Sequence, residues 1–123
     1  MIEFINHKSF DREMRGVCKK YPRGYDSFAS IKKLLSKRFS PVESENLIGP
    51  GKIHKIEDYI DIGGELWKVE MSVSNLRPNQ WPRVWFLLLN NVIYFLHIDT
   101  HQENYDHLES TNLAKDRISD LIF

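Results

Sequence analysis

Four polar residues in the C-terminal half of the chain, Lys68, Arg83, His101 and Tyr105, could act together on a phosphodiester. Cleavage of RNA by its own 2′-hydroxyl requires a base, an acid for the leaving oxygen, and cations that stabilise the phosphorane-like charge. Lysine and arginine supply cations, histidine titrates near neutral pH, and tyrosine can stack on a base. Judged by residue type alone, the favoured interpretation is structural: the lysine and the arginine are solvated cations on strands, and the tyrosine is packed against the core.

A second set of residues, His97, Asp99 and His101, has the spacing i, i+2, i+4. On a strand this spacing places all three side chains on one face, which is compatible with zinc or non-haem iron. The favoured alternative is that His97 packs against Phe95 and Phe86 and that the strand has ended by Asp99. We therefore expect no metal and no cofactor.

The element that must position these residues is a hairpin. Two apolar runs, 81–89 and 92–101, flank the pair Asn90 and Asn91. A two-residue type I′ turn needs positive φ at both central residues, and asparagine tolerates this conformation. Neither run alternates between apolar and polar residues, so we expect both faces of the hairpin to be covered.

The register of this hairpin separates two of the candidate residues. With the turn at Asn90-Asn91, Leu89 pairs with Val92, and Arg83 faces Ile98. Arg83 then lies on the opposite face of the sheet from His101. The two side chains can converge only if the strand bulges or ends after Ile98.

Around the hairpin we expect a strand–helix–helix–strand–strand–strand–strand–helix order, in which the strand at 53–60 is the least defined. Ser9 is a favourable N-cap for the first helix. Ser110 or Thr111 can cap a short C-terminal helix. The predicted fold class is α+β, with an N-terminal helical hairpin packed on a small twisted, largely antiparallel sheet.

Length and composition indicate one domain covering residues 1–123, with 41% hydrophobic residues available for a core. No apolar run is long enough for a membrane-spanning helix, and the N-terminus lacks the pattern of a secretory signal. The single cysteine, Cys18, falls on an apolar helical stripe and is interpreted as a core residue. These features favour a cytoplasmic protein without membrane partners.

The formal net charge is zero but is unevenly distributed. Residues 1–40 hold ten Lys and Arg against four Asp and Glu, whereas residues 41–123 hold seven against thirteen. The basic segment could face a polyanion or an acidic protein partner. The alternative, slightly favoured, is that these charges belong to the solvated faces of two helices.

The segment 66–105 resembles the RelE/ParE superfamily of toxins from type II toxin–antitoxin systems, most closely the RelE and HigB-like branch. The resemblance rests on Leu66-Trp-Lys-Val-Glu-Met71, Pro82-Arg-Val-Trp-Phe86, Asn90-Asn-Val-Ile-Tyr-Phe-Leu-His-Ile98 and His101-Gln-Glu-Asn-Tyr105. It implies a small twisted sheet with two N-terminal helices packed on it. It also implies an antitoxin that wraps the sheet and helices, and it leaves the oligomeric state open.

Many members of this superfamily cut mRNA without a metal, commonly on the ribosome. By resemblance, Lys68 and Arg83 match strand-borne cationic positions, His101 matches a histidine used for acid–base work, and Tyr105 matches a tyrosine near the C-terminal end. Where RelE proper has a second strand lysine this chain has Glu70, and a glutamate is a base candidate in YoeB-like relatives. The resemblance therefore implies catalytic roles for these five residues.

The expected function is accordingly that of a toxin that acts as an mRNA interferase, an endoribonuclease that cuts translated mRNA and inhibits growth. The first alternative is a non-enzymatic binding module on the same fold, either a gyrase inhibitor or an inactive toxin. A small metal-binding domain is the less favoured alternative.

Overall fold

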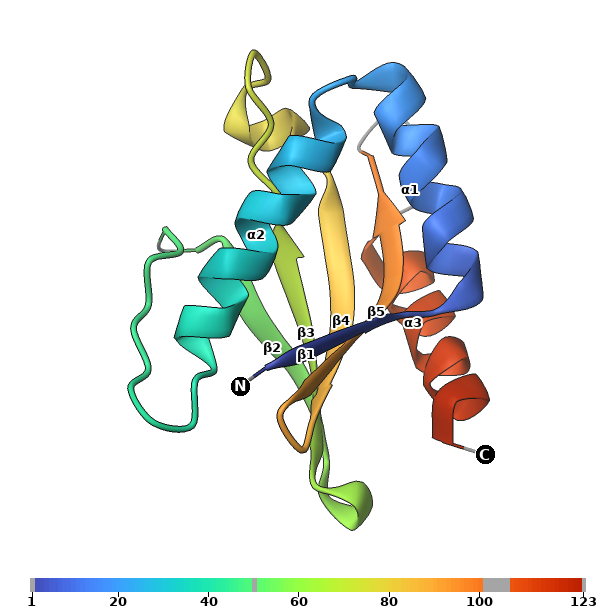
Figure 1. Cartoon of the computed structure of the whole chain (residues 1–123). Helices are drawn as coiled ribbons and strands as arrows, with labels where there is room; N and C mark the ends of the chain where they lie inside the picture. Colours follow the sequence, from blue (N-terminus) through green and yellow to red (C-terminus); the bar gives the residue numbers. More distant parts are fainter. Residues whose placement is uncertain (1, 50, 101–106, 123) are drawn as a thin grey trace.

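A five-stranded mixed sheet lies at the centre of the protein, in a computed structural model that describes residues 2–49, 51–100 and 107–122 (Figure 1). The strand order is β1-β5-β4-β3-β2, and β1 runs parallel to β5 while all other neighbours are antiparallel. The elements are β1 (Glu3–Asn6), α1 (Lys8–Lys20), α2 (Gly24–Arg38), β2 (Ile53–Tyr59), the 3₁₀ turn η1 (Ile60–Ile62), β3 (Gly64–Glu70), the 3₁₀ turn η2 (Pro78–Gln80), β4 (Arg83–Leu89), β5 (Val92–Asp99) and α3 (His107–Ile122). The predicted α+β class is confirmed.

Helices cover the two faces of the sheet unequally (Figure 1). Helices α1 and α2 pack on one face, where Phe95 lies within 4.8–6.3 Å, between ring centroids, of Phe4, Phe10, Phe28 and Phe86. Helix α3 packs on the other face over β4 and β5. Its smaller apolar contact joins Ala114 and Ile118 to Leu66, Trp85, Leu87 and Leu96. Cys18 is buried between the helices and the sheet, as predicted.

Several expectations about the helices need correction. The sheet is largely antiparallel as expected, with one parallel pair, β1 and β5, but the last helix is not short: with 16 residues it is the longest of the three described. That helix includes Ser110 and Thr111 rather than starting at them. Both side chains are buried and bond to β5 and β4. Helix α1 is capped by His7, whose Nδ1 accepts from the backbone N–H of Ser9.

The predicted turn of the β4–β5 hairpin is confirmed. Asn90 and Asn91 have φ values of 50° and 63°, and Leu89 pairs with Val92. Both strands are largely buried, as their uninterrupted apolar runs predict.

The predicted register of the far end of the hairpin is wrong, because β5 carries a bulge at Leu96. Phe86 still pairs with Phe95, but Trp85 pairs with His97 and Arg83 pairs with Asp99. The extra residue moves every later side chain of β5 to the opposite face. Arg83 therefore shares a face with His97 and Asp99 instead of with Ile98.

The left-handed turn gives a testable consequence for stability. We expect Asn91→Val to lower the free energy of unfolding by about 1–2 kcal/mol, because a β-branched residue resists positive φ. Urea denaturation measures the change. Asn79→Val is the matched control, since Asn79 is exposed and lacks positive φ, and it should shift stability by less than about 0.5 kcal/mol. Equal losses in the two variants would contradict the assignment of the turn.

Candidate functional site

Two rows of polar and aromatic side chains cross the face of the sheet that α3 partly covers. The first row joins Glu70, Arg83 and Asp99 on β3, β4 and β5, and the second joins Lys68, Trp85 and His97 on the same strands. Side chains directly opposite on neighbouring strands lie within contact distance. The bulge creates both rows, because without it neither His97 nor Asp99 would face this side.

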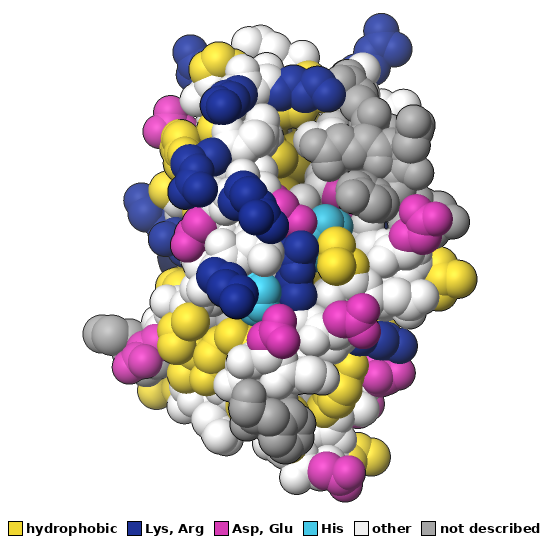
Figure 2. Space-filling view, turned by 90° about the vertical axis from the view of Figure 1, so that its right-hand side faces the viewer, with side chains coloured by type: hydrophobic (Ala, Val, Ile, Leu, Met, Phe, Trp, Pro, Cys, Tyr) yellow, Lys and Arg dark blue, Asp and Glu magenta, His cyan; other side chains and the backbone are white. Residues whose placement is uncertain are grey.

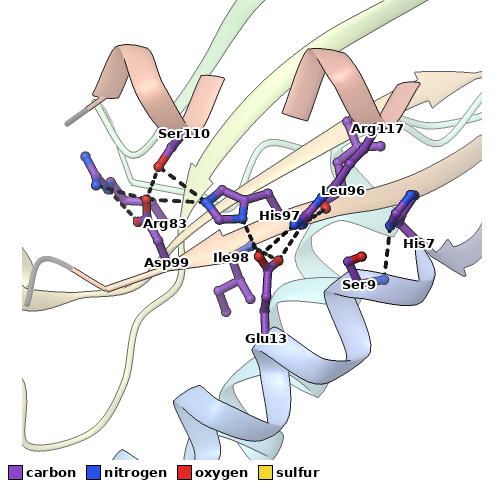
Figure 3. Close-up of polar contacts among 10 residues, drawn as sticks. All are labelled: His7, Ser9, Glu13, Arg83, Leu96, His97, Ile98, Asp99, Ser110 and Arg117. Carbon is purple, nitrogen blue, oxygen red and sulfur yellow. Dashed lines mark hydrogen bonds and ion pairs between the residues drawn. The ribbon is translucent and has the colours of Figure 1, made fainter. Parts of the chain in front are cut away.

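A buried ion pair lies at the centre of the first row (Figure 3). The Arg83 guanidinium donates from Nε to Asp99 Oδ1 at 2.9 Å and from Nη2 to Asp99 Oδ2 at 3.1 Å. Asp99 is fully buried and Arg83 is 9% exposed. Such two-bond pairing fixes the orientation of the guanidinium, and it uses donors that would otherwise be available to phosphate.

His97 links this pair to helix α1 (Figure 3). Its Nδ1 lies 2.9 Å from Glu13 Oε2, and its Nε2 lies 3.3 Å from Ser110 Oγ. Arg117 of α3 donates to both Glu13 carboxylate oxygens at 2.7 and 3.0 Å. With His97 protonated, the groups from Arg83 to Arg117 form a chain of alternating charge that runs through Asp99, His97 and Glu13.

The same side chains satisfy the edge of β5 where no strand covers it. Strand β1 ends at Asn6, opposite Phe95, so among the described residues no strand pairs with the outer backbone groups of β5 beyond that point. Arg117 Nη1 donates to the Leu96 carbonyl at 2.7 Å, and the Ile98 N–H donates to Glu13 Oε1 at 3.4 Å. The chain of charges therefore replaces the missing strand and leaves these backbone groups hydrogen-bonded.

Hydrogen bonds within this chain shift the pKa values of its histidine and its two carboxyl groups. Burial disfavours the imidazolium, but hydrogen bonds to Asp99 and Glu13 outweigh it and raise the pKa of His97 above its ordinary value. Burial likewise opposes ionisation of the two acids. Hydrogen bonds from His97, with Arg117 for Glu13 and with Ser110 and Arg83 for Asp99, lower the pKa of both carboxyls.

Ser110, His97 and Glu13 have the order of a nucleophile, a base and an orienting acid. The bonding directions exclude this role. The Ser110 hydroxyl donates to Asp99, so its oxygen accepts from the protonated Nε2 of His97, and that nitrogen is then no base. Ser110 is also fully buried, and His97 is 1% exposed. These residues hold α3 to the sheet instead.

The accessible part of the face lies on β3. Lys68 and Glu70 are half-buried, and Glu70 Oε2 lies 3.5 Å from Lys52 Nζ. Burial lowers the pKa of the Lys68 ammonium; the charge of Arg83 adds to this effect, and Glu70 and Asp99 oppose it. A cation, a carboxylate and a fixed guanidinium are thus neighbours at the boundary between the buried chain and solvent.

Of the five residues predicted for catalysis, the structure brings Lys68, Glu70 and Arg83 together. His101 and Tyr105 lie outside the described residues. The sequence-based hypothesis gave no role to Glu13 and treated Ser110 only as a possible helix cap, whereas both complete the polar chain. An acidic residue inside an amphipathic helix and a serine before an apolar stripe carry no signal by themselves.

His97 belongs to two further expectations, a metal-binding set and a packing contact with Phe95 and Phe86. Within residues 2–49, 51–100 and 107–122, no group of three side chains is arranged to hold a metal ion, and His101 of the predicted set lies outside them. His97 packs on Trp85, with ring centroids 5.4 Å apart, rather than on Phe95 and Phe86, and β5 continues to Asp99.

Comparison of the chain with protein-family models, with curated proteins and with solved structures finds no significant match. No helix in the described part of the chain combines the length and apolarity needed to cross a bilayer.

The buried pair predicts a large effect of removing one charge. We expect Asp99→Asn to lower the free energy of unfolding by about 3–5 kcal/mol, because it leaves the Arg83 cation buried and uncompensated. Asp58→Asn breaks the exposed ion pair with Lys55 and should cost less than about 1 kcal/mol. Urea denaturation of both variants is the measurement, and an equally small loss for Asp99→Asn would contradict the pairing.

The raised pKa of His97 predicts that stability depends on pH. The native state holds the imidazole proton more tightly than the unfolded chain, so this stabilisation is full below about pH 6.5. It is lost as the pH rises through the raised native value. We expect the free energy of unfolding to fall more steeply in the wild-type chain than in His97→Gln as the pH rises above about 6.5. Parallel pH profiles of the two proteins would refute this.

Proposed function

We propose that this protein is a metal-independent endoribonuclease of RelE/ParE type, a toxin that cuts mRNA in the cytoplasm and is neutralised by a cognate antitoxin. One observation carries the proposal: Lys68, Glu70 and Arg83 are neighbours on the one face of the sheet that its helices leave partly open. The order of elements, with two helices between the first strand and the rest of the sheet, also agrees with the resemblance.

In the proposed reaction the 2′-hydroxyl of the substrate attacks the adjacent phosphorus, and its proton passes to the Glu70 carboxylate. Lys68 binds a non-bridging phosphate oxygen and stabilises the added negative charge. The bond from phosphorus to the 5′-oxygen breaks, and His101 protonates that leaving oxygen. The products are a 2′,3′-cyclic phosphate and a free 5′-hydroxyl. Tyr105 stacks on a base beside the scissile bond.

Arg83 has a different role from the one that its residue type suggests. Because Asp99 holds its guanidinium through two hydrogen bonds, Arg83 contributes a fixed positive potential beside Lys68 rather than a mobile phosphate clamp. Burial and, to a smaller extent, this charge lower the pKa of Lys68, whereas Glu70, Asp99 and a bound phosphate oppose that effect. Substitution of Arg83 would also disturb the buried chain, so Lys68 and Glu70 are the cleaner test positions.

A second candidate function is that of a non-enzymatic binding module on the same fold, a gyrase inhibitor or an inactive toxin. The observation that favours it is the engagement of Arg83 by Asp99, which leaves the guanidinium 9% exposed. This candidate predicts growth inhibition without cut mRNA, or neither effect.

We expect Lys68→Met and Glu70→Gln each to lower the rate of RNA cleavage by about 100-fold or more. The measurement is the appearance of new mRNA ends after induction of the chain, together with the growth rate of the culture. Both side chains are half-buried rather than enclosed, so the urea midpoint should change little.

Lys55→Met is the matched control. Lys55 lies on the neighbouring strand β2 and pairs with Trp67, whose side chain faces α1 and α2. Lys55 therefore lies on the face of the sheet opposite to Lys68, and the control removes an equal charge from that face. Cleavage at the wild-type rate by Lys68→Met and Glu70→Gln would refute the proposed mechanism. Growth arrest by the wild-type chain with intact mRNA would favour the binding module.

A further inference from the structure

Helix α1 presents a straight line of cations on its outer surface. Lys8, Arg12, Arg15 and Lys19 follow one another at spacings of four, three and four residues, and all are exposed. At 100° per residue their directions fall within about 60° of arc, over a length of about 16 Å. We call these four residues the α1 stripe. Figure 2 looks onto this side of the molecule and shows Lys and Arg side chains concentrated in its upper left part.

The cations of the α1 stripe outnumber the acids of the same helix by four to two. Within the described part of the chain none of its four members forms an ion pair. The helix itself has two acids, and both are engaged elsewhere. Asp11 accepts a hydrogen bond from Asn6, and Glu13 belongs to the buried chain. Asp11 keeps its negative charge and lies three and four residues from Lys8 and Arg15, so the stripe retains a net positive potential of four cations against one exposed acid.

Gly16 lies beside this line, about 40° outside its arc, and no contact in the structure requires a glycine there. It is exposed, and a Cβ added to it would meet nothing within 4 Å. In the interior of a helix, glycine costs about 1 kcal/mol relative to alanine. By spacing, Gly16 adjoins Arg12 and Lys19 on the helix surface, so its missing side chain leaves open space beside these two cations, which we call the Gly16 notch. Glycine is commonly found where the backbone of a protein approaches a ligand closely.

We propose that the α1 stripe and the Gly16 notch bind the sugar–phosphate backbone of single-stranded RNA. The inference does not rest on the proposed cleavage, because α1 packs on the opposite face of the sheet from Lys68 and Glu70. A line of evenly spaced cations matches a linear polyanion, and such contacts fix a strand without reading its sequence.

An acidic protein and a lipid surface fit the α1 stripe less well. Protein interfaces are anchored by buried apolar and aromatic side chains, and α1 exposes no large hydrophobic residue. Insertion into a membrane surface needs an apolar helix face, but the apolar face of α1, formed by Phe10, Met14 and Val17, is buried in the core.

The test measures binding of a fluorescein-labelled 2′-O-methyl RNA of about 20 nucleotides, followed by fluorescence anisotropy at several salt concentrations. The 2′-O-methyl group removes the attacking hydroxyl, so the probe cannot be cut and binding is separated from cleavage. Four phosphate contacts predict a slope of about −2.8 for log K against log salt, or about a 50-fold loss of affinity between 50 and 200 mM. Arg12→Gln with Arg15→Gln should reduce the slope to about −1.4 and the loss to about sevenfold.

Two control variants separate the α1 stripe from net charge and from helix stability. Lys33→Gln with Lys37→Gln removes the same charge from exposed positions of α2 and should leave the slope unchanged. Gly16→Ala should raise the urea midpoint, because alanine favours the helix, and yet weaken RNA binding about fivefold or more by filling the notch. Ser30→Ala, at an exposed position of α2, should leave binding unchanged.

Several results would overturn the proposal. Equal losses from the α1 and α2 double variants would mean that net charge alone attracts RNA. Stripe-dependent binding of a polyglutamate peptide, with no binding of the RNA, would identify the surface as a site for an acidic protein. Stripe-dependent binding to vesicles containing phosphatidylglycerol, again without RNA binding, would identify a lipid contact. Unchanged RNA affinity in Gly16→Ala would remove the notch from the site.

Discussion

The single extra residue at Leu96 is the constraint on which the candidate site depends. By shifting the register of β5 against β4, it turns His97 and Asp99 toward the face that carries Arg83. A buried arginine without a carboxylate would be strongly destabilising, and so would a buried aspartate without a cation. The bulge brings the two together and lets His97 continue the chain of charges toward Glu13. Sheet geometry and electrostatics therefore depend on each other here.

The two faces of the sheet are stabilised by different forces. Helices α1 and α2 are held by a dense apolar core around Phe95, whereas α3 combines a small apolar contact with directed polar bonds. Those bonds include Trp85 Nε1 to Thr111 at 3.1 Å and the approach of His7 to Asp120 at 3.0 Å. Apolar contacts tolerate small displacements, but hydrogen bonds between buried charges do not. The position of α3 relative to β5 is consequently specified by a few named atoms.

Local patterns predicted much of the fold but not the register of its central hairpin. The Asn90-Asn91 turn, the apolar strands and the helical stripes each follow from neighbouring residues, and they were expected correctly. The position of the bulge leaves no such signal, because Phe95 and Leu96 are both apolar and both are buried, although they lie on opposite faces of the sheet. The partners of His97 were missed for a related reason. Glu13 lies 84 positions away along the chain, and only the completed fold brings it to the imidazole.

The position of Phe95 in the chain has a consequence for synthesis. Strand β1 and helices α1 and α2 pack against Phe95 and its neighbours, which leave the ribosome long after them. Until β5 has been made, α1 lacks the strand that it contacts most and β1 lacks its partner strand. The apolar face of α1 therefore stays largely uncovered through most of elongation, and such a state favours chaperone binding or aggregation. Completion of the fold is a single late event in which the middle of β5 closes both layers at once.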